Sequence, residues 1–337
     1  MIAKYRSLIF CLAILLVPSS LAFANKTKHI EHWLDRMAHA SEALSYKGRF
    51  IHEVDSETSL LEIVHVVADK GSRERIVSLS GEPQELIRDQ HGNVFLMDFK
   101  QPLLIDKNVH EVSLAVRLKQ NLSNVLKNYR FNFDKVDRVA GRKSQVFSIV
   151  PLDMQRYSYR LWVDDETGFL IRSQLINEKG KVLEHIMFSD IEIMKTPNNS
   201  LLQAVRYSDE FDVNSSRSDI PDNSNKVNQI DAWHITGKPS GFWQVNHNPN
   251  MLLGAKKSVI YLSLTDGLAS VSVYIEPLKQ PVKKMLSGVS RSGALSAFGR
   301  VIDHHQITVV GEVPPTTVEE IGNAVTRATV SLSTKGE

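Results

Sequence analysis

The feature that most constrains the fold is a series of strand-like segments divided by short runs of turn-forming residues. Residues 46–99 contain five such segments, YKGRFIHEV, SLLEIVHVVA, RERIVSLSG, QELIRDQ and NVFLMDF. The runs DKGS, SGEP and DQHGN divide them, and these are rich in residues that favour tight turns. Turns every 8–12 residues or so, without helical segments between them, predict an antiparallel meander and not repeated βαβ units.

Two segments have helical spacing instead. In residues 30–44 (IEHWLDRMAHASEAL), apolar residues such as Trp33 and Met37 recur every three or four positions, which predicts an amphipathic helix. A second helical stretch is expected from Val112 to Tyr129. Strands are then expected to resume from Val146 to about Ile193.

The N-terminus has the pattern of an export signal. Lys4 and Arg6 precede the apolar run SLIFCLAILLV, and small residues at Ala22–Ala24 give a cleavage sequence. We predict a signal peptide over residues 1–24, cleaved near Ala24, with an uncleaved N-terminal anchor as the alternative. The expected location of the mature chain is the periplasm. The single cysteine, Cys11, leaves with the signal, so no disulfide is expected.

Loss of the signal also changes the charge balance. Residues 1–24 hold two basic residues and no acidic one, so 38 of the 40 Lys and Arg remain, against 38 Asp and Glu. A formally neutral chain lacks the concentrated basic surface that nucleic-acid binding needs, so no nucleic-acid partner is predicted.

A change of composition divides the mature chain in two. Residues 209–229 are rich in Ser, Asn and Asp, which is typical of a linker. We therefore expect an N-terminal domain over residues 25–208, a smaller C-terminal domain over 230–330 and a frayed tail at 331–337. The segment TVEEIGNAV is expected to form the last helix, capped by Thr316 or Thr317.

The stretch PLDMQRYSYRLWVDDETGFLIRSQLINEKGKVLEH is dense in arginine, aromatic and acidic residues. From Arg156 to Val163 the residues alternate, so the two tyrosines and Leu161 are expected on one face of a strand and the arginines on the other. A simple hairpin register would place Arg160 opposite Arg172. The arginine face either meets an anionic partner or is a solvated outer face. The acidic residues 164–166 fall in the following turn, where we expect them to be solvated.

The sequence contains no arrangement typical of an enzyme. It lacks a dinucleotide-binding glycine motif, a phosphate-binding Gly-Lys-Ser/Thr loop and a nucleophile elbow, and its 12 histidines are scattered. We predict no catalytic residue, no metal site and no cofactor. Binding is better supported, because an antiparallel sheet with an apolar face could enclose a hydrophobic ligand. Phe242 and Trp243, between glycine and proline, are either an aromatic contact loop or anchors of a core strand.

Long ordered blocks of the chain resemble the RseB/MucB family, periplasmic negative regulators of the sigma-E envelope-stress response. The blocks begin with WLDRMAHASEALSYKGRF and RVAGRKSQVFSIVPLDMQRYSYRLWVDDETGFLIRSQLINEKGKVLEHIMF. They continue with LTDGLASVSVYIEP and VVGEVPPTTVEEIGNAV, so the resemblance covers almost all of the mature chain. One departure is Ser158, where the family pattern leads us to expect glycine.

The resemblance implies an α+β fold with two parts. The N-terminal domain would be similar to lipoprotein carriers of the LolA/LolB type, a curved antiparallel half-barrel with helices on its concave side. The C-terminal domain would be a smaller antiparallel sheet with a helix. The family binds the periplasmic segment of a transmembrane anti-sigma factor and shields it from the first protease cut, and lipid or lipopolysaccharide favours release.

Candidate binding residues follow from expected side-chain exposure. The residues expected to contact the anti-sigma segment are Arg156, Arg160, Arg172, Phe242 and Trp243. Those expected to line a lipid cavity are Trp33, Met37, Tyr157, Tyr159, Leu161, Phe169 and Ile171. The alternative function is a periplasmic lipoprotein or lipid carrier, and a periplasmic enzyme is a weaker third class. A homo-oligomer is left open.

Overall fold

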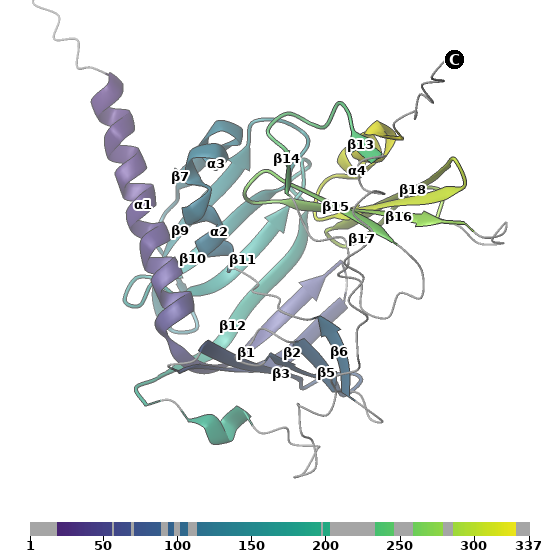
Figure 1. Ribbon diagram of the computed structural model, residues 1–337. Coiled ribbons are helices and arrows are strands. Elements are labelled where there is room, and N and C mark those ends of the chain that lie inside the picture. Colours follow the sequence, from purple (N-terminus) through teal and green to yellow (C-terminus); the bar gives the residue numbers. More distant parts are fainter. Residues whose placement is uncertain are drawn as a thin grey trace, which may run out of the picture.

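The computed structural model describes residues 19–55, 57–68, 71–88, 94–97, 102–106, 113–196, 198–202, 233–245, 259–278 and 286–327. Most of the predicted signal peptide, the predicted linker 209–229 and the predicted tail 331–337 lie outside these ranges. Within them the chain is a mixed α+β protein with a large N-terminal antiparallel sheet and a smaller C-terminal one, as the sequence predicts (Figure 1). None of the described helices combines the length and apolar character needed to cross a membrane.

The large sheet has 12 strands in the order β6-β5-β4-β3-β2-β1-β12-β11-β10-β9-β7, with β8 also paired to β9. Every strand pair is antiparallel, which confirms the predicted meander. Its strands are β1 (Ser45–Val54), β2 (Glu57–Ala68), β3 (Gly71–Ser78), β4 (Glu85–Arg88), β5 (Val94–Met97), β6 (Pro102–Asp106), β7 (Tyr129–Phe133), β8 (Asp137–Val139), β9 (Arg142–Pro151), β10 (Ser158–Asp164), β11 (Leu170–Ile176) and β12 (Val182–Met194).

Three helices accompany this sheet, which curves from β9–β12 round to β1–β6 (Figure 1). They are α1 (Ser19–Ala43), α2 (Leu114–Gln120) and α3 (Leu122–Asn128), and the 3-10 helix η1 (Asn199–Leu202) follows β12. The predicted single helix at 112–129 is therefore two short helices that meet at Asn121, whose side chain bonds to the carbonyl of Arg117. The helices pack on one sheet face through buried residues that include Trp33, Met37 and Leu161.

The C-terminal part contains a six-stranded sheet in the order β14-β15-β16-β19-β18-β17 and a two-stranded sheet, β13-β20. Helix α4 (Pro315–Ala324) packs on the larger sheet through Val318 and Ile321, which are fully buried. The strands are β13 (Trp233–Ile235), β14 (Trp243–Val245), β15 (Ile260–Thr265), β16 (Ser270–Pro277), β17 (Gly288–Ser292), β18 (Leu295–Ile302), β19 (His305–Gly311) and β20 (Val325–Arg327).

The N-terminus of α4 corrects one expectation. The helix begins after Pro314 without a side-chain cap, so neither Thr316 nor Thr317 is its N-cap. Thr317 is completely buried, and its hydroxyl donates to the backbone and side-chain oxygens of Gln155, from the segment before β10. A residue expected to cap the start of a helix instead joins the two parts of the protein.

Candidate functional site

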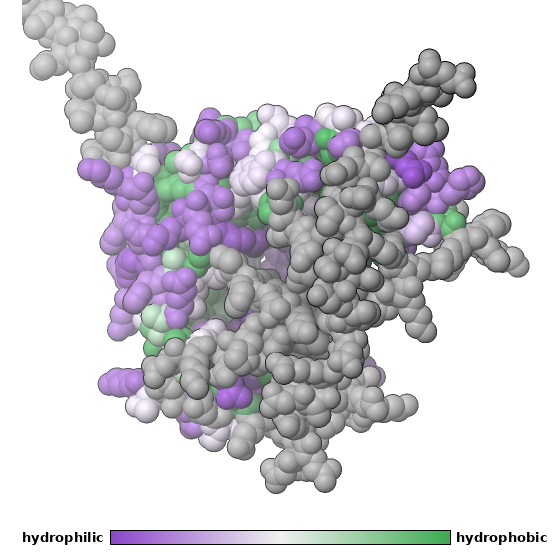
Figure 2. Space-filling model, in the orientation of Figure 1, coloured by the Kyte–Doolittle hydropathy of each residue, from purple (hydrophilic) through white to green (hydrophobic). Residues whose placement is uncertain are grey.

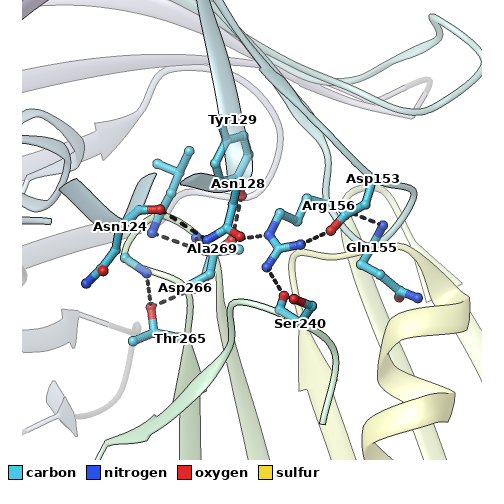
Figure 3. Close-up of polar contacts among 12 residues, drawn as sticks. Asn124, Asn128, Tyr129, Asp153, Gln155, Arg156, Ser240, Thr265, Asp266 and Ala269 are labelled. Atoms are coloured by element: carbon cyan, nitrogen blue, oxygen red, sulfur yellow. Dashed lines mark hydrogen bonds and ion pairs between the residues drawn. The ribbon is translucent and has the colours of Figure 1, made fainter. Parts of the chain in front are cut away.

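The two parts of the molecule meet around Arg156, in the short segment between β9 and β10 (Figure 3). Its side chain has no exposed surface. The guanidinium donates through Nε to Asp266, through Nη1 to Asp153, and through Nη2 to the carbonyl of Ser240 at 2.6 Å. Asp266 and Ser240 belong to the C-terminal part, so one side chain of the N-terminal part is bonded to two C-terminal segments.

Asp266 is equally enclosed and has a full set of donors. It lies in the turn between β15 and β16, where its Oδ1 accepts from the backbone amides of Leu268 and Ala269 at 2.9 and 2.8 Å. Its Oδ2 accepts from Arg156 and from the hydroxyl of Tyr129 at 2.8 Å. A buried carboxylate without such partners would cost several kcal/mol, and here each oxygen has two. We call Tyr129, Asp153, Arg156, Ser240 and Asp266 the junction cluster.

Two aromatic rings enclose the guanidinium. Its central carbon lies 4.7 Å from the ring centroid of Phe242 and 5.8 Å from that of Tyr129, in the range of cation–π contacts. Burial of Arg156 opposes its charge, but the hydrogen bond and the charge of Asp266 outweigh this effect and raise the pKa of the guanidinium. Burial, reinforced by the charge of Asp266, also raises the pKa of Tyr129 well above its ordinary value.

Gly241 is required for this close approach. Its φ of +80° is in the left-handed region, and a Cβ there would lie 2.3 Å from Asn128 Oδ1 and 2.7 Å from Arg156 Nη2. No other residue type could follow Ser240 without moving the Asn128 and Arg156 side chains.

A second set of contacts links Asp55, after β1, and Tyr157, before β10, to the turn between β17 and β18. The amide of Gly293 donates to Asp55 Oδ2 at 2.6 Å, and Tyr157 packs with Ala294. Asp55 is exposed, whereas Tyr129, Arg156 and Asp266 of the junction cluster are buried. The contacts of Arg156 and of Asp55 with the C-terminal part therefore differ greatly in solvent access.

The predicted arginine face is only partly correct. Arg156 precedes β10 and is buried, so its expected position on an outer face is wrong. A register shift next to Trp162 pairs Arg160 with Gln174 and Arg172 with Trp162, so the two arginines are not opposite each other. Instead their guanidinium carbons lie 5.2 and 4.1 Å from the Trp162 ring.

Acidic residues accompany this outer group. Arg160 Nε lies 3.3 Å from Asp134, and the indole of Trp162 donates to Asp137 at 2.8 Å. That hydrogen bond lowers the pKa of Asp137, while burial lowers the pKa of Arg172. We call Asp134, Asp137, Arg160, Trp162 and Arg172 the outer cluster.

Phe242 and Trp243 differ in burial, so one interpretation does not apply to both residues. Phe242 is 3% exposed and belongs to the core of the C-terminal part, so it is a core anchor. Trp243 is partly exposed at the start of β14. Its ring lies beside Gly267, in the turn that carries Asp266.

The predicted cavity-lining residues do not form one group. Trp33, Met37 and Leu161 are in the core beneath the helices, with Tyr159 packed against it. Phe169 and Ile171 belong to a second cluster, in which Phe169 contacts Tyr46 and Phe188. Tyr157 belongs to a third cluster, together with Ala294 of the C-terminal part. Their role as a lipid lining stays a prediction.

The acidic turn also differs from expectation. Asp164 is only 2% exposed and accepts from Arg142 at 3.0 Å and from the amide and hydroxyl of Thr167. Asp165 bonds to Lys143 at 2.7 Å, and this contact lowers its pKa. The expectation of solvated carboxylates is wrong for Asp164, which organises the turn.

The surface is mainly polar on the side that carries α1, with hydrophobic residues in small separate patches (Figure 2). A cavity of about 440 Å³ lies on the N-terminal part, between the end of β12 and η1. It is lined by Lys47, Glu192, Ile193, Met194, Lys195, Thr196, Asn198 and Leu201. None of the predicted site residues is among them.

Sequence reasoning missed Asp266, Tyr129 and Ser240. The only signal for Asp266 is the Asp-Gly pair at a strand end, which is typical of a turn and gives no hint of a partner 110 residues earlier. Tyr129 gives no signal beyond its place at the end of a helical pattern. The cluster depends on tertiary contacts, which a pattern of neighbours does not contain.

Comparison with known proteins shows which family the chain belongs to. Residues 29–206 match the family model of the MucB/RseB N-terminal domain, and residues 227–326 match that of the MucB/RseB C-terminal domain. The sigma factor AlgU regulatory protein MucB of Pseudomonas aeruginosa is 30% identical over 305 residues, which cover 90% of this chain and 92% of the relative. The sigma-E factor regulatory protein RseB of Haemophilus influenzae is 25% identical over 312 residues, with 92% and 95% coverage.

Solved structures agree with the sequence matches. The P. aeruginosa MucA/MucB complex structure contains a chain that is 28% identical, with a TM-score of 0.68 and coverage of 89% of this chain and 99% of that one. A crystal structure of MucB with MucA(peri) matches at 27% identity and a TM-score of 0.66, covering 88% and 98%. Because both family models match, one on each part of the fold, the chain belongs to the MucB/RseB family.

Proposed function

We propose that this protein is a periplasmic negative regulator of the sigma-E envelope-stress response. It binds the periplasmic part of a transmembrane anti-sigma factor and shields that part from the first protease cut. The observation that carries the proposal is similarity along both parts of the chain to MucB, including MucB in complex with MucA.

A binding role suits the chemistry of the junction. Arg156 and Asp266 are buried at the junction and bonded to each other. The backbone amides of Leu268 and Ala269 also donate to Asp266. The Arg156–Asp266 pair holds two parts of the protein together and does not present either charge for proton transfer to a substrate. Relatives with regulatory names favour the same conclusion, that the protein is a binding protein and not an enzyme.

The proposed mechanism links two sites. Lipid acyl chains enter the apolar face of the N-terminal part, and the anti-sigma segment binds near the junction. Each ligand favours a different arrangement of the two parts, which makes their affinities interdependent. Of the predicted contact residues, Arg160, Arg172 and Trp243 keep exposed surface and remain our proposed contacts, whereas Arg156 and Phe242 act by shaping the junction.

The test is a titration with the periplasmic fragment of the cognate anti-sigma factor, followed by fluorescence anisotropy. We expect saturable binding, slower cleavage of the bound fragment by the first-site protease, and weaker binding when lipopolysaccharide is added. Absence of fragment binding would contradict the proposed function. Binding that lipid does not alter would contradict only the linkage.

The alternative is a lipid or lipoprotein carrier. The second part of the chain favours the regulator, because a carrier has no need of a further sheet fastened by a buried ion pair. Capture from envelope extracts separates the two functions, since a regulator retains an anti-sigma factor and a carrier retains a lipoprotein.

Export and domain limits are part of the proposal. Helix α1 begins at Ser19 and continues past the proposed cleavage site near Ala24, so cleavage would leave most of the helix in the mature protein. Intact-mass measurement of the periplasmic protein tests this site. Limited proteolysis tests the proposed domains, 25–208 and 230–330, through preferential cutting in the proposed linker 209–229.

A further inference from the structure

Two histidine–glutamate pairs join β1 to β12 at the end of β1 that precedes Asp55. His52 Nε2 lies 2.8 Å from Glu184 Oε1, and His185 Nδ1 lies 2.8 Å from Glu53 Oε2. Each strand supplies one histidine and one glutamate from consecutive residues. Because consecutive side chains in a strand point to opposite faces, the two pairs lie on opposite faces of the same strand pair. We call these four residues the double clamp.

The double clamp lies next to the exposed contact between the two parts. Strand β1 ends at Val54, and the following residue is Asp55, which accepts from the Gly293 amide. The Asp55 amide also donates to the carbonyl of Leu183, the residue before Glu184. The position of Asp55 is therefore coupled to that of the first residues of β12. The double clamp joins the two strands at Glu53 and His52, two and three residues before Asp55.

The first pair shares its sheet face with few other titratable groups. The cross-strand row through Glu184 contains Leu175, Val54, Tyr159 of β10 and Glu57 of β2. The hydrogen bond that His52 donates to Glu184 raises the pKa of His52, and partial burial opposes this effect. The stabilisation is therefore fully present below the ordinary histidine pKa of about 6.5 and is lost as the pH rises through the higher pKa of folded His52.

The second pair lies on the other face, among basic groups. The row through His185 contains Glu53 of β1, Thr58 of β2, Gln174 of β11 and Arg160 of β10. Arg172 belongs to the neighbouring row, and its charge interacts with that of Glu53. Glu53 therefore has His185 within hydrogen-bond distance and lies close enough to Arg172 for their charges to interact.

We propose that the double clamp is a proton-dependent lock, which holds Asp55 against the C-terminal part when His52 is charged. Mild acid strengthens the Asp55–Gly293 contact, and alkaline pH loosens it. The buried Arg156–Asp266 pair stays intact in both conditions. The lock is a property of the chain alone and goes beyond the proposed partner binding.

Amide hydrogen exchange of Gly293 measures this contact directly, because that amide is the donor to Asp55. The protein is studied in full as exported, without partner, between pH 5.5 and 8, and rates are converted to protection factors to remove the intrinsic effect of pH. We expect protection to fall roughly two- to fivefold with rising pH, the range for partly exposed ion pairs. In the double variant His52→Gln/His185→Gln, protection is low and independent of pH.

Two further variants make the test decisive. The control His39→Gln removes an exposed histidine on α1 and keeps the pH response. Glu53→Gln/Glu184→Gln keeps both histidines and loses the response, which covers the case in which the histidine variant folds poorly. A pH response retained in either double variant would overturn the proposal.

Discussion

The junction cluster and the outer cluster are built from the same residue types and differ in their access to water. Each places arginine over an aromatic ring and beside two aspartates. Arg156 has no exposed side-chain surface, whereas that of Arg160 is 45% exposed. Water therefore competes for the Arg160–Asp134 contact of the outer cluster but not for the Arg156–Asp266 contact of the junction cluster.

The difference has an energetic consequence. Exposed ion pairs contribute about 0–1 kcal/mol, because solvent and salt screen the charges. Removing one partner of a buried pair costs about 3–5 kcal/mol, because the other charge remains desolvated. The junction cluster should therefore determine how the two parts are held together, while the outer cluster is free to contact a partner at little cost to stability.

Asp266→Ala should produce the largest effect. It leaves Arg156 buried beside Asp153 alone and Tyr129 without its acceptor, so we expect the free energy of unfolding to fall by about 3–5 kcal/mol. Urea unfolding followed by tryptophan fluorescence measures the change. In the control Arg156→Met/Asp266→Leu both charges are removed together, and most of the stability should return. A loss below about 1 kcal/mol for Asp266→Ala would show that the pair is not effectively buried.

Tyr129→Phe removes one donor from Asp266 and keeps the ring. Hydrogen bonds to charged groups contribute about 1.5–3 kcal/mol, and the three remaining donors place the expected loss near the lower limit. The same substitution at Tyr261, which is half-buried in β15 away from the cluster, is the matched control. Equal losses at both positions would contradict a special role for the Tyr129 hydroxyl.

Gly241→Ala tests the close approach of the backbone to Arg156. We expect a loss of about 1–2 kcal/mol, from the positive φ and from displacement of Arg156 and Asn128. Gly237→Ala is the control, because Gly237 has a φ of +72° but nothing within 4 Å of a Cβ. Thermal unfolding should separate the two variants, and equal melting temperatures would mean that crowding at Gly241 has no energetic effect.

The outer cluster should give the smallest effects. Trp162→Phe removes the donor to Asp137, so the pKa of that carboxyl should rise towards its ordinary value. A lowered pKa in the folded state stabilises the protein above the unfolded pKa of about 3.9, and this stabilisation is lost as the pH falls. The variant should differ slightly less in stability between pH 6 and pH 3 than the wild type. NMR titration of Asp137 checks the shift, and an unchanged pKa would contradict the assignment.

The sequence was sufficient for features that depend on neighbouring residues. Strand alternation and turn residues predicted β1 to β5 and the antiparallel order, because these preferences act within a few positions. The amphipathic spacing of Trp33 and Met37 correctly predicted the buried face of α1. Turn composition also placed residues 165 and 166 correctly in a turn, while Asp164 is the last residue of β10.

Features that depend on packing between distant segments could not be predicted in this way. Alternation assigned Arg156 to the same face as Arg160, but the chain leaves the strand pattern before β10 and turns Arg156 towards Asp266. The register shift at Trp162 moved Arg172 next to the indole. Phe242 and Trp243 are adjacent in sequence, yet only the folded structure determines which one is buried.

A pair of double-mutant cycles tests the central claim, that the junction cluster and not the outer cluster fixes the arrangement of the two parts. One cycle combines Arg156→Met with Asp266→Asn, and the other combines Arg160→Met with Asp134→Asn. We predict a coupling energy above about 1.5 kcal/mol at the junction and below about 1 kcal/mol on the outer face. Equal coupling energies, or a larger one on the outer face, would contradict the claim.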